Sequence, residues 1–91
     1  MSTLLMKHQV ADFDTWFAGF NSHEGLRTSH GATSHRVFQD GHTVVVSVDF
    51  PDGASVAAFR SDPALAQAMK EAGVISVPEV DLLTEVDTRT Y

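Results

Sequence analysis

The chain has 91 residues, of which 43% are hydrophobic and 20% are charged, an ordinary globular composition. This length suits one domain over residues 1–91, with a small core that dimerisation would enlarge. The formal net charge of -6, with only 6 Lys and Arg residues, argues against nucleic acid and against an anionic membrane surface as partners.

Cysteine is absent, which excludes disulfides, thiolate nucleophiles and thiolate metal sites. The N-terminal residues carry no basic segment ahead of a long apolar run, so no signal peptide is expected. No apolar stretch reaches the length of a membrane span. We therefore expect a cytoplasmic protein.

The N-terminal part of the chain predicts a strand followed by a helix. Residues 3–10 alternate between two faces, which is typical of a β-strand, and His8 lies near its end. Asp12 is then placed as the N-cap of a helix. We expect this helix to fray near Gly25 or to end before Gly31. Its apolar stripe, at the helical spacing i, i+3, i+4 and i+7, consists of Phe13, Trp16, Phe17 and Phe20.

Two further strands are predicted over residues 32–40 and 43–50. Asp40 and Gly41 between them are a strong hairpin signal. The second of these strands is apolar on both faces, which is typical of a central strand.

A second helical region and a last strand complete the pattern. Asp62 and Pro63 form a matched N-cap and first helical residue, and Gly73 is placed just past the helix end. The order β-α-β-β-α-β predicts an α+β, ferredoxin-like fold, with a four-stranded antiparallel sheet and two helices on one face. The second helical region is predicted over residues 55–60 and 64–72. The last strand region is predicted over residues 74–77 and 80–86, with an interruption at Pro78.

The two faces of this sheet differ in character. The face that carries Leu5, Val45 and Leu83 is mixed, but it is too apolar to be simply solvated. We therefore expect two copies to pack face to face as a homodimer. The other face, which we assign to the helices, contains Leu4, Met6, Val10, Val44, Val46, Val48, Phe50, Val80 and Leu82.

Four stretches carry a resemblance that covers nearly the whole chain. They are residues 8–16, residues 31–37 with His35-Arg36-Val37 at their end, residues 58–65, and residues 72–74. In them the sequence resembles the dimeric α/β-barrel superfamily, which includes the antibiotic biosynthesis monooxygenases, polyketide cyclases, haem-degrading enzymes and lactone isomerases. The resemblance implies a ferredoxin-like fold, a dimer, and a cavity between helices and sheet. It does not select one of these reactions.

All 5 histidines lie between positions 8 and 42. His8 occupies a core-facing strand position, where a desolvated imidazole suits proton transfer near neutral pH, although a structural histidine with one hydrogen bond fits equally. His23 continues the apolar stripe, either as a polar group in the cavity wall or as a solvent-facing residue at the helix end. His30 and His42 lie beside glycines and are predicted as solvated turn residues.

Only one of the neighbours His35 and Arg36 can enter the cavity, because adjacent residues of a strand point to opposite faces. On the cavity side, Arg36 would stabilise an enolate, phenolate or carboxylate. On an edge strand it would discourage pairing with another edge. Phe38 decides between the two, since it shares a face with Arg36. Trp16 is either a core residue or a flat wall on which an aromatic substrate stacks.

These residues lead to a functional hypothesis. We expect a small cofactor-independent enzyme of secondary metabolism that acts on an aromatic or polyketide-like molecule by acid/base chemistry, through cyclisation, dehydration or oxygenation. No metal is expected, because the histidines lack ligand spacing. The alternatives are a non-catalytic dimeric ligand-binding or accessory module and a haem-handling protein. The candidate residues are His8, His23 and His35 for catalysis, and Trp16, Phe20 and Arg36 for substrate binding.

Overall fold

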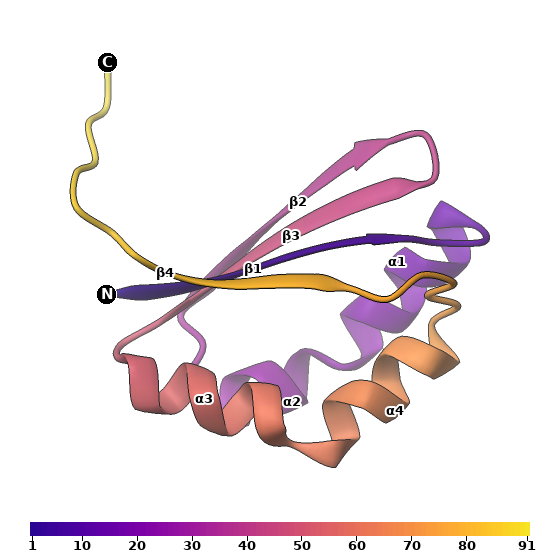
Figure 1. Ribbon diagram of the computed structural model, residues 1–91, viewed down its shortest axis with the longest axis horizontal. Helices are drawn as coiled ribbons and strands as arrows, with labels where there is room; N and C mark the ends of the chain where they lie inside the picture. Colours follow the sequence, from indigo (N-terminus) through magenta and orange to yellow (C-terminus); the bar gives the residue numbers. More distant parts are fainter.

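A four-stranded antiparallel sheet forms one layer of the molecule, and the computed structural model describes all residues 1–91 (Figure 1). The strand order is β2-β3-β1-β4, which confirms the predicted ferredoxin-like α+β fold. The strands are β1 (Ser2–Gln9), β2 (Ser34–Asp40), β3 (Thr43–Phe50) and β4 (Glu79–Thr84).

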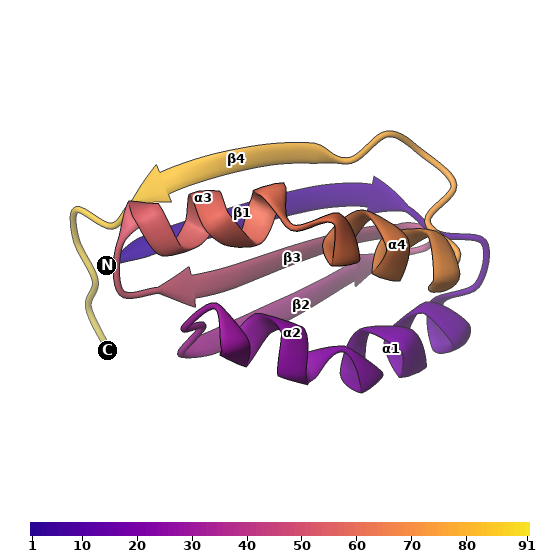
Figure 2. The same ribbon diagram turned by 90° about the horizontal axis from the view of Figure 1, so that it is seen from below.

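Both helical connections are broken in two, and all four helices cover the same face of the sheet in two rows (Figure 2). The first connection breaks at His23, earlier than the predicted fraying near Gly25. The second breaks at Asp62, as predicted. No helix combines the length and the apolar character needed to cross a membrane. The helices are α1 (Phe13–Ser22), α2 (Glu24–Ser29), α3 (Gly53–Ser61) and α4 (Pro63–Glu71).

Aspartate side chains cap the N-termini of α1, α3 and α4. Asp12 accepts a hydrogen bond from the backbone N–H of Thr15 at 2.9 Å, and this bond lowers the pKa of the Asp12 carboxyl. Asp62 accepts one from the N–H of Ala64 at 2.9 Å, and Pro63 is the first residue of α4. Both predicted N-caps are confirmed. The Asp12 carboxylate therefore has a structural role as the N-cap of α1.

The register of the sheet decides which side chains face the helices. Directly opposed residues of an antiparallel pair share a face, and His8 opposes Val44 while Met6 opposes Val46. The predicted helix-covered face is confirmed, but Leu82 remains 50% exposed because β4 is an edge strand. The buried residues of this face are Leu4, Met6, His8, Val44, Val46, Val48 and Phe50.

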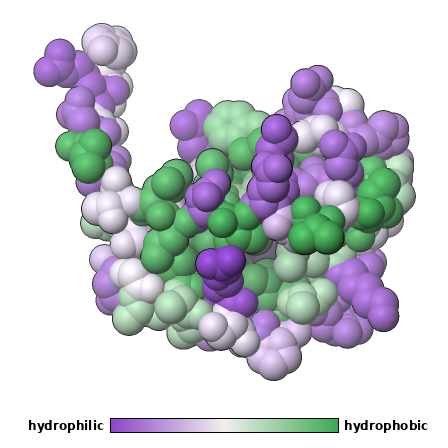
Figure 3. Space-filling model, in the orientation of Figure 1, coloured by the Kyte–Doolittle hydropathy of each residue, from purple (hydrophilic) through white to green (hydrophobic).

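The opposite face of the sheet is open and partly apolar. Leu83 and Phe38 are each 46% exposed there, and Leu5 and Val45 are half-buried. Figure 3 shows apolar side chains gathered along β4. The strand is at the sheet edge, so its side chains are exposed on both faces.

The segment before β4 differs from the prediction. Residues 74–77 form no strand beyond a single bridge from Val74 to Val10. In place of a backbone carbonyl of a neighbouring strand, the Oγ of Ser76 accepts a hydrogen bond from the backbone N–H of Gln9 at 2.8 Å. Pro78 has no N–H to donate, and β4 begins only at the next residue. Beyond β4 the C-terminal tail runs away from the body of the molecule (Figure 1).

His30 and His42 both lie in turns, as predicted, and His42 is exposed. His30 is instead partly buried, so its prediction as a solvated residue is wrong. His30 Nε2 lies 2.8 Å from Asp62 Oδ2, and its ring meets that of Phe59 edge-on at 5.7 Å. This hydrogen bond is the main cause of the lowered pKa of Asp62, and it ties the end of α2 to the α3–α4 junction. His42 Nδ1 lies 3.2 Å from the carbonyl oxygen of Val10.

Candidate functional site

A largely apolar cavity lies between the helices and the sheet, where the sequence-based resemblance predicted one. Its volume is about 40 Å³, and 10 of its 14 lining residues are hydrophobic. A volume of this size holds a few water molecules. The polar and aromatic side chains that line it are His8, Trp16, Phe20, His23, Arg27 and Phe59.

His8 is the polar group at the sheet side of the cavity. It is 3% exposed, because its position on β1 places it in the row of apolar side chains beneath the helices. Its ring centroid lies 5.5 Å from that of Trp16, and its Nδ1 has no hydrogen-bond partner. Burial lowers the pKa of His8, so the imidazole is neutral at physiological pH. A neutral imidazole with an unoccupied ring nitrogen is suited to proton transfer.

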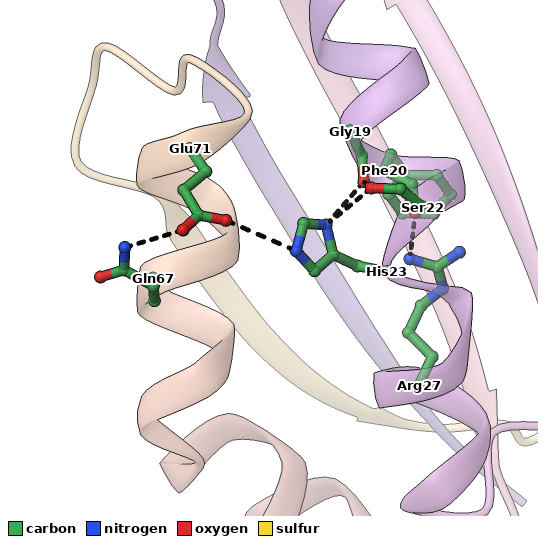
Figure 4. Close-up of polar contacts among 7 residues, drawn as sticks. All are labelled: Gly19, Phe20, Ser22, His23, Arg27, Gln67 and Glu71. Carbon is green, nitrogen blue, oxygen red and sulfur yellow. Dashed lines mark hydrogen bonds and ion pairs between the residues drawn. The ribbon is translucent and has the colours of Figure 1, made fainter.

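His23 caps the break between α1 and α2 and also lines the cavity (Figure 4). Its Nδ1 lies 2.7 Å from the carbonyl oxygen of Gly19, and because a carbonyl only accepts, Nδ1 carries the proton. Its Nε2 faces Glu71 Oε2 at 3.7 Å, so protonation of Nε2 would form an ion pair. His23 therefore lies at the end of α1 and lines the cavity, with its side chain only partly exposed to solvent.

The aromatic stripe of α1 forms the apolar wall. The rings of Trp16 and Phe20 stack with centroids 5.1 Å apart and an interplanar angle of 24°. Both belong to the core cluster and both line the cavity. The two roles that the sequence left open for Trp16 are thus compatible.

Arg27 is the residue of this site that sequence reasoning did not select. Its side chain is only 5% exposed, and its guanidinium carbon lies 3.7 Å from the centroid of the Phe20 ring. Nη1 donates to the carbonyl oxygen of Phe20 at 2.8 Å, while Nη2 is buried without a partner. Its spacing was the available signal, since Arg27 follows Phe20 by seven residues and therefore lies on the same helical stripe.

His35 and Arg36 lie outside this cavity. His35 opposes Val48 on the helix-covered side of the sheet. Its ring contacts the Phe20 ring edge-on, with the two ring centroids 5.0 Å apart, on the side of Phe20 that faces away from the cavity. It lines a separate polar pocket of about 70 Å³ between α2 and β2, which Arg27 also borders.

Arg36 points to the open face together with Phe38, and its guanidinium carbon lies 4.9 Å from that ring centroid. Phe38 does not pack under the helices, so the alternation of the strand keeps Arg36 away from the cavity.

Comparison with known proteins identifies the fold. No protein-family model matches the chain, and no curated protein matches its sequence. SnoaB, a cofactor-independent oxygenase from Streptomyces nogalater, superposes with a TM-score of 0.78 at 14% identity, over 96% of this chain and 94% of that chain. The chain therefore shares its ferredoxin-like fold with this oxygenase.

Two other solved structures with this ferredoxin-like fold are similar. The ActVA-Orf6 monooxygenase of Streptomyces coelicolor, in complex with nanaomycin D, gives a TM-score of 0.72 at 16% identity, over 99% of this chain and 91% of that chain. NE2512, a protein of unknown function from Nitrosomonas europaea, gives a TM-score of 0.72 at 18% identity, over 99% of this chain and 93% of that chain. At these identities the likeness concerns the fold.

Within this ferredoxin-like fold, the site has the groups for acid/base work. No group of three His, Asp or Glu side chains is placed to hold a metal ion. The cavity instead combines a neutral imidazole, a second imidazole with a fixed proton, a guanidinium and an aromatic wall. Such a set can move a proton and hold the resulting negative charge.

The buried state of His8 predicts a specific pH dependence of stability. Its folded pKa lies below the ordinary value of about 6.5, so the unfolded chain binds a proton first as the pH falls. Between about pH 7 and pH 5 the wild type should therefore lose more unfolding free energy than His8→Gln, which cannot titrate there. Urea unfolding at each pH measures this, and NMR of the His8 ring should give a pKa below the ordinary value. Equal losses in both proteins would contradict the assignment.

Proposed function

We propose that this protein is a small cofactor-independent enzyme of secondary metabolism that acts on an aromatic or polyketide-like substrate by acid/base chemistry. The observation that carries the proposal is the buried His8, whose Nδ1 lacks a partner in an apolar cavity. The aromatic wall of Trp16 and Phe20 supports a planar substrate.

His8 acts as the general base in this proposal. Burial keeps its imidazole neutral near pH 7, which leaves a ring nitrogen free to accept a proton from a phenol or from carbon beside a carbonyl group. Removal of that proton gives a phenolate or an enolate. Either anion can start a cyclisation or a dehydration, and with molecular oxygen as the oxidant it can start an oxygenation. His23 assists with its Nε2, because its Nδ1 is already engaged with Gly19.

Similar structures favour oxygenation among these outcomes. SnoaB is described as a cofactor-independent oxygenase, and the ActVA-Orf6 protein is a monooxygenase in complex with nanaomycin D. A cavity in the same fold, with a base and an aromatic wall, supports chemistry of that class here. His35 lies outside the cavity and only packs edge-on against Phe20 of its wall.

Substrate binding requires this cavity to widen. Its volume of about 40 Å³ is well below the roughly 300 Å³ at which drug-sized ligand pockets begin. The wall formed by α4 can supply the space, because Met69 lines the cavity there and an unbranched thioether repacks readily.

The small cavity also favours a second candidate function. A non-catalytic dimeric module would bind a small hydrophobic molecule in the same place without transforming it. The tie of His23 to the backbone of Gly19 supports this second reading, because it uses one imidazole nitrogen for structure.

A homodimer is part of both proposals. The open face of the sheet exposes Phe38 and Leu83, and isolated monomers rarely leave such a face uncovered. Two open faces packed together would bury these side chains and enlarge the small core of each subunit.

Hydrogen exchange of a carbon acid tests the proposed chemistry. The probe is 2-tetralone, an aromatic ketone whose C1 hydrogens lie between the ring and the carbonyl group. In D₂O the wild type should accelerate deuterium uptake at C1 by about 100-fold or more over buffer, as general bases do. His8→Gln should return to the buffer rate, and His42→Gln, outside the cavity, should match the wild type.

Two results of this NMR measurement would contradict the proposal. Full acceleration by His8→Gln would remove His8 as the base. Binding of 2-tetralone without acceleration would favour the non-catalytic module.

Light scattering tests the dimer. At micromolar concentration the mass should be about twice the 9.9 kDa of the chain. Val45→Asp, in the middle of the open face, should give monomers, because it places a carboxylate in the apolar contact. Val77→Asp, the same change outside the sheet, should remain dimeric. A wild-type mass near 9.9 kDa would contradict the proposal.

A further inference from the structure

Only two buried side-chain nitrogen or oxygen atoms in the chain have no hydrogen-bond partner, His8 Nδ1 and Arg27 Nη2. Both residues line the same cavity. Buried polar groups are almost always partnered in native proteins, because an unmade hydrogen bond is costly. Arg27 also borders the polar pocket between α2 and β2, but the cavity is the space that the two residues share. A ligand that enters this cavity could supply the missing partners.

Arg27 is held firmly from one side only. Its Nη1 donates to the Phe20 carbonyl in the last turn of α1, where a cation is favourable to the helix dipole, and its guanidinium covers the Phe20 ring. These contacts account for one end of the guanidinium and for its flat face. They leave Nη2 as a fully buried donor without a partner.

The charge of Arg27 is not neutralised by a contacting carboxylate. The chain has two contacts between a histidine and a carboxylate that become ion pairs on protonation, and neither includes Arg27. Glu24, on the same helix, is the one acidic group that raises the pKa of Arg27, against the larger lowering effect of burial. A guanidinium retains its charge even so, and a buried charge without a partner is unfavourable. Binding of an anion next to the Arg27 guanidinium would therefore stabilise the folded protein.

We propose that Arg27 is the anion-binding residue of this cavity, and that its ligand is an apolar, planar molecule with one acidic oxygen group. Nη2 is the buried guanidinium nitrogen without a partner, and its N–H groups can donate to an oxygen of a carboxylate or of an ionised phenol or enol. The apolar body of the ligand lies against Trp16 and Phe20. This inference rests on the proposed function in that both place the ligand in the same cavity.

Binding of matched naphthalene compounds tests the proposal. The probes are 2-naphthoate, its neutral analogue 2-naphthamide, and 2,4-dinitro-1-naphthol, which is ionised at neutral pH and represents a phenolate. Calorimetry measures all three affinities. For the two colourless probes, the fluorescence of Trp16, the single tryptophan of the chain, shows whether they enter the cavity.

The wild type should bind 2-naphthoate at least about tenfold more tightly than 2-naphthamide, as a charge-assisted hydrogen bond implies. Arg27→Gln should lose this preference while its affinity for 2-naphthamide stays the same. Arg36→Gln is the matched control, because it removes a cation from the open face, and it should keep the full preference. The dinitronaphthol shows whether a phenolate is accepted as well as a carboxylate.

The outcomes separate the two proposals. Equal wild-type affinities for naphthoate and naphthamide, or an unchanged preference in Arg27→Gln, would overturn the role of Arg27 alone. No binding of any probe would overturn both proposals. Circular dichroism and thermal melting establish that each variant is folded. If Arg27→Gln does not fold, Arg27→Lys replaces it in the test. Lysine lacks the planar guanidinium, so the preference for 2-naphthoate over 2-naphthamide should weaken several-fold. An unchanged preference in Arg27→Lys would contradict the proposal.

Discussion

The burial of alternate side chains of β1 beneath the helices is the constraint on which the site depends. The antiparallel register places Leu4, Met6 and His8 in one row, opposed by a fully buried row on β3. Because this row must be covered to exclude water from its apolar members, the imidazole of His8 is covered with them. The same packing that stabilises the core therefore keeps His8 neutral and leaves its Nδ1 without a partner.

The helical layer adds the rest of the site through its breaks and its close contacts. The break at His23 turns the chain so that His23 and Arg27 return toward the cavity that α1 lines. At Gly19, an added Cβ would lie 3.0 Å from the Cβ of Ala72, so the absence of a side chain lets α1 approach the end of α4 closely. The cavity is thus small because its walls are drawn together, and the α4 side carries the flexible Met69.

Sequence periodicity was sufficient for the fold and for half of the site. Strand alternation placed His8 correctly, and the helical stripe placed Trp16 and His23 beside it. Periodicity could not decide between His35 and Arg36, since either face of an edge strand fits the pattern until its register with β3 is known. Periodicity placed Arg27 on the helical stripe but could not show its burial, which depends on tertiary contacts with the ring and the carbonyl of Phe20.

If the cavity between helices and sheet is a ligand site, His8 and Arg27 are its polar partners. A crystal structure of the protein with 2-naphthoate would show this. We expect the naphthalene rings to lie against Trp16 and Phe20, with a carboxylate oxygen within hydrogen-bonding distance of Arg27 Nη2 and the α4 wall displaced at Met69. Density for the ligand on the open face of the sheet, with the cavity still closed around an unpartnered Arg27, would contradict it.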